Sequence, residues 1–240
     1  MRSWVTGSTR QLVPLSLATH LYCDIFTYLT YFAYDGHNSP MEQSSYTLAF
    51  EYALNQLEQK LPGFLTYHSY FHTVREVLPV SRRLAQECGV PDEDLQLLEL
   101  AAVYHDIGYL HNIQEHEQAS AKVAQEVLPG FGLSKAEIET ITSMILATRL
   151  PAKPTTLLEK ILADADLFVL GGEDFFNRSE DLRRELSARG QAYPLKKWYE
   201  IQLAFMEEHA YFTPVAAELC GEHKRRNIQE LKRLLAELKD

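Results

Sequence analysis

The chain has 240 residues, which is enough for one well-buried core or for one core with an appended helical piece. Hydrophobic residues make up 46% and charged residues 23%, a globular composition that argues against a largely disordered chain. The 33 acidic residues outnumber the 23 basic ones and give a net charge of -10, which argues against a dedicated nucleic-acid binder because such a surface repels phosphate backbones.

The three cysteines lie far apart in the sequence, at Cys23, Cys88 and Cys220. No CxxC pair is present, so neither a disulfide framework nor a cysteine zinc site is indicated. Reduced thiols are typical of proteins that stay in the cytosol. We therefore expect a cytoplasmic protein.

The first forty residues differ from the rest. Residues 11–34 are apolar and aromatic, but His20 and Asp24 interrupt them. No apolar run of about 18 residues appears, as a spanning helix requires, and no signal-peptide cleavage site follows, so we expect no membrane partner. We predict that residues 1–40 are a loosely attached extension, or that translation begins at Met41.

From Met41 onward, nearly every segment has helical periodicity, and Gly or Pro breaks separate the segments. Two capping boxes, S-x-x-E from Ser134 and T-x-x-E from Thr156, predict helix starts. No strand-like alternation of useful length appears. The predicted helices cover the stripe 46–57, about 66–87 with a kink at Pro79, 95–106, 116–128, 135–145, 157–167, 174–189, 194–209 and 214–238. The fold class is therefore all-α, with a helical domain over 41–210 and a C-terminal helical segment over 211–240.

The segment YHSYFHT places His68 and His72 at i and i+4. On a helix this spacing puts both imidazoles on one face, where they could bind a metal ion. The zinc-protease version of this pattern needs Glu directly after the first His, and the chain has Ser69 there. By itself, the pair is better explained as two incidental histidines on a half-buried face.

The segment VYHDIGYL places His105 and Asp106 at the end of an otherwise apolar helix. Burying a carboxylate beside an imidazole is costly unless something compensates the charge, and a divalent cation is the simplest compensation. A structural cap, with Asp106 paired to a backbone amide, is the alternative.

The segment ILADADLF adds Asp164 and Asp166 within a further apolar helix. Side chains at i and i+2 of a helix point in different directions. We therefore expect only one of these two carboxylates to face a site shared with His105 and Asp106.

Together, YHSYFHT, VYHDIGYL and ILADADLF, in that order, resemble the HD superfamily of metal-dependent phosphohydrolases over about residues 66–170. The resemblance implies an HD-domain helical bundle, here with additional C-terminal helices. It implies a divalent metal ion bound by His72, His105, Asp106 and Asp166. Asp166 is chosen because its Ala-Asp-Leu context is similar to that of the family's ligand.

The resemblance also implies roles around these ligands. Asp164 becomes a candidate to orient a ligand histidine. The cyclic-nucleotide phosphodiesterase branch has YHN-x-x-H, in which the first His protonates the leaving oxygen. This chain is similar but has Ser69 in place of the Asn, so His68 is either the general acid or a supporting or surface histidine.

Members that bind two ions carry a histidine near His116 and another near Thr148 and Arg149, where this chain has none. We therefore expect one divalent ion, Mn, Fe, Co, Ni, Zn or Mg, and leave a second ion open. His116 and Arg149 are predicted to contact a phosphate group of the substrate.

These features predict a metal-dependent phosphohydrolase or phosphodiesterase. The expected substrate is small and phosphorylated, a nucleotide that carries a phosphomonoester or a cyclic phosphodiester. Metal-activated water would attack, with His68 and Asp106 as catalytic residues. The alternative is a regulatory HD module that binds metal or nucleotide without turnover. The composition also permits a homodimer, but the sequence indicates no interface.

Overall fold

The structure is a computed structural model that describes residues 40–238, with side chains described from residue 45 onward. From Gln43 onward the chain forms one compact unit. Every regular element among the described residues is helical, which confirms the all-α prediction. None of these helices is both long and apolar enough to span a bilayer. The predicted extension over residues 1–40 lies outside the described residues except for its last one.

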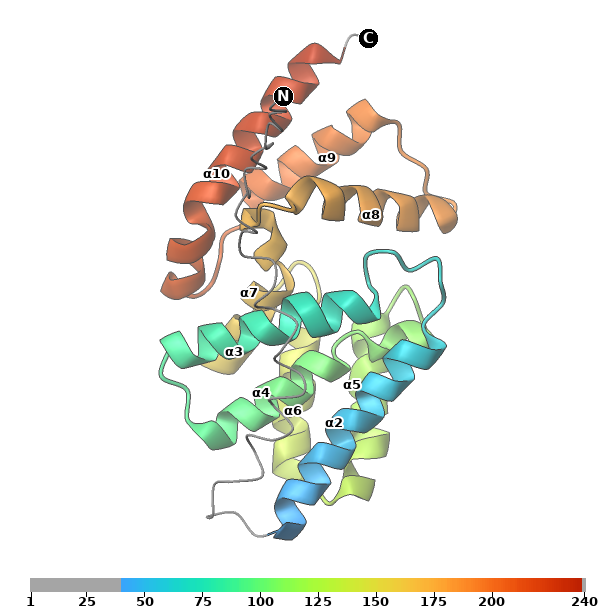
Figure 1. Cartoon of the computed structure of the whole chain (residues 1–240), viewed down its shortest axis with the longest axis vertical. Coiled ribbons are helices and arrows are strands. Elements are labelled where there is room, and N and C mark those ends of the chain that lie inside the picture. The colour runs from blue at the N-terminus through green and yellow to red at the C-terminus, as the bar shows by residue number, and fades with distance from the viewer. Residues whose placement is uncertain (1–39, 239–240) are drawn as a thin grey trace, which may run out of the picture. The chain divides into compact units, whose positions relative to one another are not determined.

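The larger group of helices surrounds α4 (Asp92–Tyr104) (Figure 1). The last seven residues of α4 are all buried, as expected for a helix that is packed on every side. The Tyr104 hydroxyl donates a hydrogen bond of 3.0 Å to the Ala49 carbonyl oxygen and so ties α4 to α2. The helices of this group are α2 (Pro40–Lys60), α3 (Leu78–Glu87), α5 (His116–Val127), α6 (Lys135–Ala147) and α7 (Leu157–Asp166).

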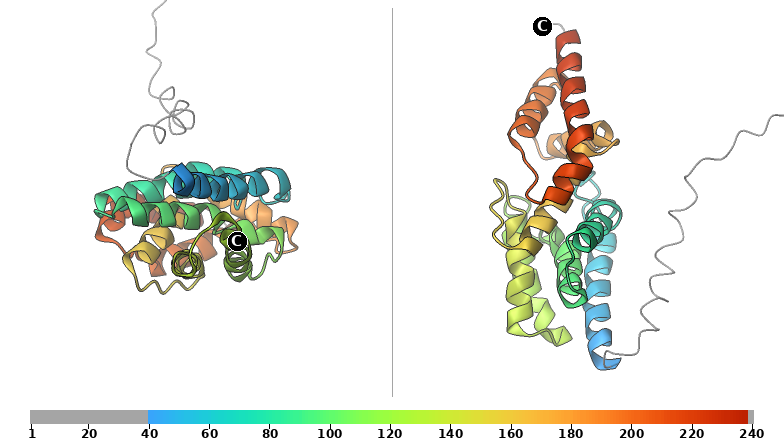
Figure 2. Two further views of the ribbon diagram at one scale, coloured as in Figure 1. Left: turned by 90° about the horizontal axis from the view of Figure 1, so that it is seen from below. Right: turned by 90° about the vertical axis from the view of Figure 1, so that its left-hand side faces the viewer.

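The C-terminal helices gather at one end of this unit, and the views in Figure 1 and Figure 2 agree on that arrangement. They share a smaller core made by Leu170, Phe175, Met206 and Leu231. A Cβ at Gly171 would lie 2.5 Å from the Cβ of Cys220, so only glycine lets the last helix pack so closely here. The elements of this group are η4 (Phe168–Gly171), α8 (Phe175–Ala188), α9 (Leu195–Glu208) and α10 (Pro214–Glu237).

Both predicted capping boxes are present. The Ser134 hydroxyl accepts a hydrogen bond of 3.3 Å from the Glu137 amide, and the Glu137 carboxylate accepts one from the Ser134 amide. Thr156 and Glu159 form the same reciprocal pair at the start of α7. These caps satisfy amides that have no partner within the helix.

The helix predicted over about Thr66–Glu87 begins later and is not uniform. Regular helix starts at Tyr70, continues as a π-helix, η1 (His72–Val77), and becomes α3. Pro79 has no amide hydrogen, and its ring would clash with the carbonyl group four residues earlier in an α-helix. The π-helix before Pro79 avoids this clash because its hydrogen bonds span five residues. At the end of η1 the Leu78 amide donates to the Thr73 carbonyl oxygen.

The predicted shared helix face of His68 and His72 was therefore wrong. His68 lies in the turn that precedes the helix, and His72 is the first residue of η1. Their ring centroids are nevertheless 6.1 Å apart, because the turn folds His68 back beside the helix.

Candidate metal centre

The His-Asp pair occupies the end of the central helix. His105 is the C-cap of α4, and Asp106 leaves the helix with φ -105° and ψ 1°. The chain then enters the short helix η2 (Ile107–Leu110). Both side chains are nearly fully buried, with 1% of His105 and 3% of Asp106 exposed.

Gly108 explains how α5 approaches this turn. A Cβ at Gly108 would lie 2.0 Å from the His116 carbonyl oxygen and 2.5 Å from the Ser120 amide nitrogen. Its own amide donates a hydrogen bond of 2.7 Å to the Ser120 hydroxyl oxygen. The absence of a side chain therefore lets α5 pack on the turn. In this position His116 Nε2 lies 3.7 Å from Asp106 Oδ1.

The predicted metal ligands converge from three separate segments. His72, His105 and Asp106 each offer one ligand atom, and these atoms lie within 4.8 Å of one another. Asp166, the last residue of α7, places its Oδ1 3.1 Å from His72 Nε2 and 3.6 Å from His105 Nε2. The structure thus brings together all four residues that the sequence predicted.

The outer nitrogen of each ligand histidine is held by a hydrogen bond. His72 Nδ1 lies 2.8 Å from Glu76 Oε2, and His105 Nδ1 lies 2.7 Å from the Ala102 carbonyl oxygen. A carboxylate and a carbonyl group can only accept, so Nδ1 carries the proton in both rings. The Nε2 atoms consequently face the space between the carboxylates, where each would offer a lone pair to a metal ion that displaced its proton.

Two polar atoms at the centre have no hydrogen-bond partner among the described residues. His105 Nε2 and Asp106 Oδ2 are both buried, and they lie 3.3 Å apart without hydrogen-bonding geometry. Leaving such atoms unsatisfied is costly, about 1–3 kcal/mol each. A divalent cation bound between them satisfies both, and two imidazoles with two carboxylates suit a transition metal or Mg²⁺. The residues therefore fit the implied metal ion.

Without a cation, protonated histidines offset the charges of the carboxylates. Burial alone would lower the pKa of His72, but hydrogen bonds to Asp166 and Glu76 raise it to about 9. The same opposition of burial and carboxylates raises the pKa of His105. Burial would raise the pKa of Asp106 and Asp166, yet the adjacent histidines lower both. A divalent cation would take the place of these protons.

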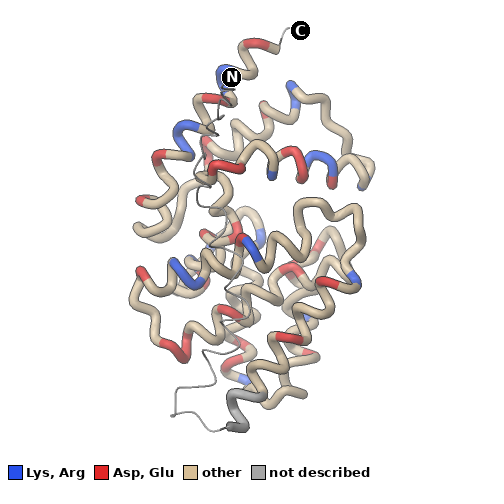
Figure 3. The backbone as a smooth tube through the Cα atoms, viewed as in Figure 1, with Lys and Arg blue, Asp and Glu red and all other residues tan. Residues whose placement is uncertain are grey.

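Glu76 is fixed in turn by a residue of α8. Arg178 Nε lies 2.7 Å from Glu76 Oε1, and Arg178 also donates to Glu76 Oε2 at 3.1 Å and to the Tyr67 carbonyl oxygen at 2.9 Å. Arg178 is only 5% exposed although α8 is rich in charged residues of both signs (Figure 3). This chain of contacts fixes the ring orientation of His72 from outside the ligand segments.

His68 is held by a second residue of α8. Its Nδ1 lies 2.7 Å from Oε1 of the fully buried Glu185. The other oxygen of Glu185 accepts hydrogen bonds of 3.0 Å from the amides of Tyr67 and His68. Burial would raise the pKa of Glu185, but its bonds to His68 and the amides lower it. The ring of His68 stacks on Tyr109, with centroids 4.5 Å apart.

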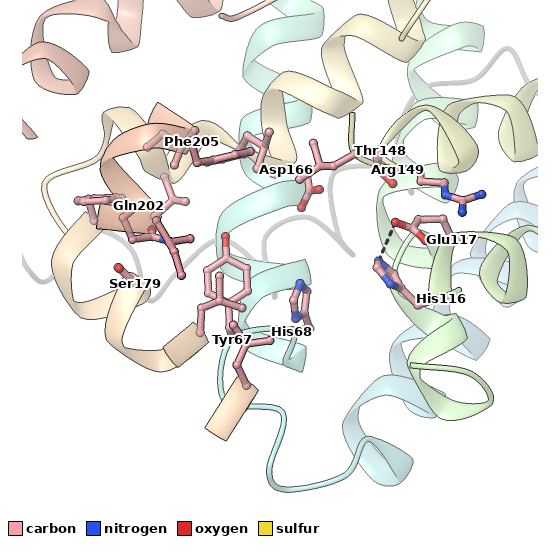
Figure 4. A pocket seen from close by; sticks show the side chains of 18 of the residues that line it. Tyr67, His68, His116, Glu117, Thr148, Arg149, Asp166, Ser179, Gln202 and Phe205 are labelled. Atoms are coloured by element: carbon pink, nitrogen blue, oxygen red, sulfur yellow. Dashed lines mark ion pairs between the residues drawn. The ribbon is translucent and has the colours of Figure 1, made fainter. Parts of the chain in front are cut away.

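A cavity of about 550 Å³ opens beside these residues. Asp166 and His68 lie near its middle, and His116, Glu117 and Arg149 lie on one side (Figure 4). His116 Nε2 is 3.5 Å from Glu117 Oε1. His116 and Arg149, the two predicted phosphate contacts, therefore line the same space as the ligand Asp166.

Asp164 faces away from this cavity. One of its oxygens accepts a hydrogen bond of 2.8 Å from the Phe212 amide, and the other accepts bonds from the amide and hydroxyl of Thr213. Thr213 is the N-cap of α10. Asp164 thus anchors the segment before α10, and its hydrogen bonds join it to no ligand histidine.

Sequence reasoning missed three residues of this site. Glu76 lies four residues after His72, so the i, i+4 spacing could have identified it. Arg178 and Glu185 lie more than a hundred residues from the histidines they support. No motif marks them, because their partners are set by how α8 packs.

Comparison with known proteins identifies the segment that bears this centre. Residues 70–169 match the family model of the HD domain. The chain carries an HD domain. All four candidate ligands lie within the HD domain, whereas His68, Arg178 and Glu185 lie outside the matched residues. No curated protein sequence matches the chain.

Solved structures share the fold of the HD domain and of the helices around it. A predicted HD superfamily hydrolase from an uncultured Thermotogales bacterium has 21% identity and a TM-score of 0.54, with 78% of this chain and 91% of that one covered. Bacillus subtilis YpgQ in complex with ADP has 18% identity and a TM-score of 0.58, covering 82% and 97%. A Lactobacillus plantarum protein has 19% identity and a TM-score of 0.58, covering 81% and 97%. At these identities the similarity establishes the fold alone.

Proposed function

We propose that this protein is a metal-dependent phosphohydrolase that hydrolyses a phosphate ester of a nucleotide, either a monoester or a cyclic diester. The observation that carries the proposal is the pair of buried, unpartnered atoms, His105 Nε2 and Asp106 Oδ2, in a cluster of His72, His105 and Asp106 that Asp166 adjoins. Such a cluster is costly for a purely structural role, because each atom is desolvated without compensation.

His72, His105, Asp106 and Asp166 would hold the ion. When bound, a divalent ion lowers the pKa of a water molecule and polarises a phosphoryl oxygen. Of the four side chains, Asp166 also lines the cavity where a substrate would enter. Asp106, held by the turn after α4, would orient the attacking water by accepting a hydrogen bond from it.

His68 supplies the proton for the leaving oxygen in this proposal. Glu185 accepts the proton of His68 Nδ1, so Nε2 is the nitrogen that remains to act in the cavity. The bond to Glu185 also fixes the orientation of the ring, so that Nε2 is the atom from which a proton can be donated into the cavity. The proton passes from His68 Nε2 to the departing ester oxygen as the phosphorus–oxygen bond breaks.

The structural neighbours support this proposal without deciding it. One is described as a predicted hydrolase of the HD superfamily, and another was solved with ADP. The cavity beside the HD ligands, with about 550 Å³, is large enough for a nucleotide-sized ligand. Arg149 at one side offers a planar guanidinium for a phosphate group.

The test is phosphate release from a panel of nucleoside monophosphates and cyclic nucleotides with the metal-loaded protein. We expect Asp106→Ala to lose both metal and turnover, and His68→Gln to keep metal but lose most of its turnover. His111→Gln is the matched control, because His111 is exposed and outside the cavity. Metal binding without turnover of any phosphate ester would instead indicate a regulatory HD module.

A further inference from the structure

The cavity continues away from the metal ligands into the C-terminal helices. On that side its walls are side chains of α8 and α9, which lie beyond the HD match (Figure 4). Two of the large rings are nearly fully buried, with 2% of Phe175 and 2% of Trp198 exposed. We call this part the apolar arm, and define it by Phe175, Leu182, Leu186, Trp198, Ile201 and Phe205.

Gln202 is a polar side chain within this apolar surrounding. It is 7% exposed and lines the cavity, yet its amide has no hydrogen-bond partner among the described residues. An amide that lines a cavity and is not engaged by the protein is free to pair with a polar group of a bound ligand. The amide offers a donor beside an acceptor.

Ser179 provides a second polar group on the same wall. Its hydroxyl oxygen accepts a hydrogen bond of 2.9 Å from Trp198 Nε1, which leaves the hydroxyl hydrogen available to donate. Ser179 is 6% exposed and lines the cavity near Gln202 (Figure 4). The arm therefore combines apolar walls with two polar groups on one side.

The charges of the cavity lie elsewhere. Among the described residues that line it, Arg149 is the only Lys or Arg, and Glu117 and Asp166 are the only carboxylates. In Figure 4 Arg149 and Glu117 lie across the cavity from Gln202, with Asp166 between them. The apolar arm is thus suited to an uncharged part of the substrate, while the phosphate group lies at the HD ligands.

The apolar walls and the Gln202 amide of the apolar arm together favour one kind of uncharged group over others. A sugar would bring several hydroxyl groups that apolar walls cannot satisfy, and a hydrocarbon chain would leave the Gln202 amide unpaired. A flat nitrogen heterocycle fits both conditions, because its faces are apolar and its edge offers a donor beside an acceptor. Amide side chains pair with such edges in two-point contacts.

We propose that the apolar arm is the base-binding subsite of this protein and that Gln202 reads the edge of the heterocycle. This proposal rests on the proposed function, in that the same substrate would place its phosphate at the HD ligands. It assigns substrate selection to α8 and α9 rather than to the HD domain. The predicted substrates are nucleotides, in preference to sugar phosphates that lack a base.

The first experiment compares kcat/KM for the four 5′-nucleoside monophosphates with that for ribose 5-phosphate. We expect the wild type to prefer at least one nucleotide, and Gln202→Leu to reduce this preference by about tenfold, as the loss of a two-point amide contact does. Gln86→Leu, on the exposed face of α3, is the control and should retain the preference. Equal turnover of ribose 5-phosphate and all nucleotides by the wild type would overturn the proposal, and so would an unchanged preference in Gln202→Leu.

The second experiment measures binding without any phosphate and so separates this proposal from the proposed function. Trp4→Phe leaves Trp198, a wall of the arm, as the only tryptophan of the chain. We expect nucleosides to quench its fluorescence saturably, ribose to have no effect, and Gln202→Leu to weaken the binding. Quenching without hydrolysis of any phosphate ester would sustain the subsite and reject the phosphohydrolase. Hydrolysis of nucleotides without nucleoside quenching of Trp198 would show that the base binds outside the apolar arm, and would overturn the subsite.

Discussion

Arg178 contacts both carboxylate oxygens of Glu76, at 2.7 Å through Nε and at 3.1 Å through a terminal nitrogen. Glu76 accepts the Nδ1 proton of the candidate ligand His72. Because Arg178 lies on α8, outside residues 70–169, one contact that orients a candidate metal ligand comes from outside the HD match. The C-terminal helices therefore support the site as well as packing beside it.

The first prediction concerns this support. Arg178→Met should weaken divalent-metal affinity by about 10- to 100-fold, since Glu76 would no longer hold His72 in its ligating orientation. Calorimetric titration of the metal-free protein with Mn²⁺ measures the change. Arg184→Met is the matched control on the same helix, because the Arg184 side chain is 63% exposed and pairs only with α8 carboxylates among the described residues. Equal losses in the two variants would contradict a specific role for Arg178.

The second prediction separates proton transfer from metal binding. Glu185→Gln replaces the carboxylate that accepts the Nδ1 proton of His68 and should lower kcat by about 10- to 100-fold, because the ring is held less firmly in the orientation that presents Nε2 to the cavity. Metal affinity should stay at the wild-type level, since Glu185 contacts no candidate ligand. Steady-state kinetics and Mn²⁺ titration on the same samples give both readouts. Glu218→Gln, exposed on α10, should match the wild type in both.

The third prediction distinguishes the two aspartates of α7. Asp164→Asn should lower the free energy of unfolding by about 2 kcal/mol, because its buried hydrogen bonds to Phe212 and Thr213 are weakened. It should retain metal, whereas Asp166→Asn should lose it. Chemical denaturation and metal content by mass spectrometry measure these effects. Loss of metal in folded Asp164→Asn would show that Asp164 orients a ligand after all.

The fourth prediction concerns the close approach of α5 to the His-Asp turn. Gly108→Ala should destabilise the protein by more than about 2 kcal/mol, since the new Cβ collides with backbone atoms that cannot rotate away. Gly130→Ala is the control, because a Cβ there meets nothing within 4 Å. Thermal unfolding of both variants checks the difference. A Gly108→Ala variant as stable as Gly130→Ala would mean that α5 packs farther from the turn.

The fifth prediction concerns pH and lies away from the metal centre. Burial, together with the charge of Lys224, lowers the pKa of His209 to about 4, and both ring nitrogens lack a hydrogen-bond partner among the described residues. The folded state therefore keeps the His209 imidazole neutral. In the unfolded state the same imidazole is protonated once the pH falls below its usual pKa of about 6.5. Stability from this group is present above that pKa and is lost as pH falls toward 4.

His209→Phe removes this titration and keeps a ring of similar size. Between pH 7 and pH 5 we expect the wild type to lose about 1–2 kcal/mol more of its free energy of unfolding than the variant loses. Urea denaturation at both pH values gives the two differences. Parallel losses in the two proteins would show that His209 is not buried as a neutral imidazole.

Much of the architecture could be predicted from local patterns. The capping boxes at Ser134 and Thr156 and the breaks around Gly171 depend on neighbouring residues, and the structure confirms the helices that they delimit. The start of the second helix could not be predicted in this way. The turn that carries His68 depends on a tertiary contact, since Glu185 holds it from α8.

The sequence by itself pointed to a cation at His105 and Asp106, because a carboxylate buried beside an imidazole in an apolar helix is costly unless something compensates its charge. The resemblance to the HD superfamily added His72 and Asp166 to this candidate ligand set. Helix geometry alone required only that Asp164 and Asp166 diverge, and the choice of Asp166 rested on the resemblance. Tertiary structure decided that choice by turning Asp164 toward the segment before α10. It also decided how the histidines are held and which side chains line the cavity, because Arg178, Glu185 and Gln202 reach these places only through the packing of α8 and α9. Contacts that form only through tertiary packing leave no recognisable pattern in the sequence, whereas helix caps and ligand motifs do.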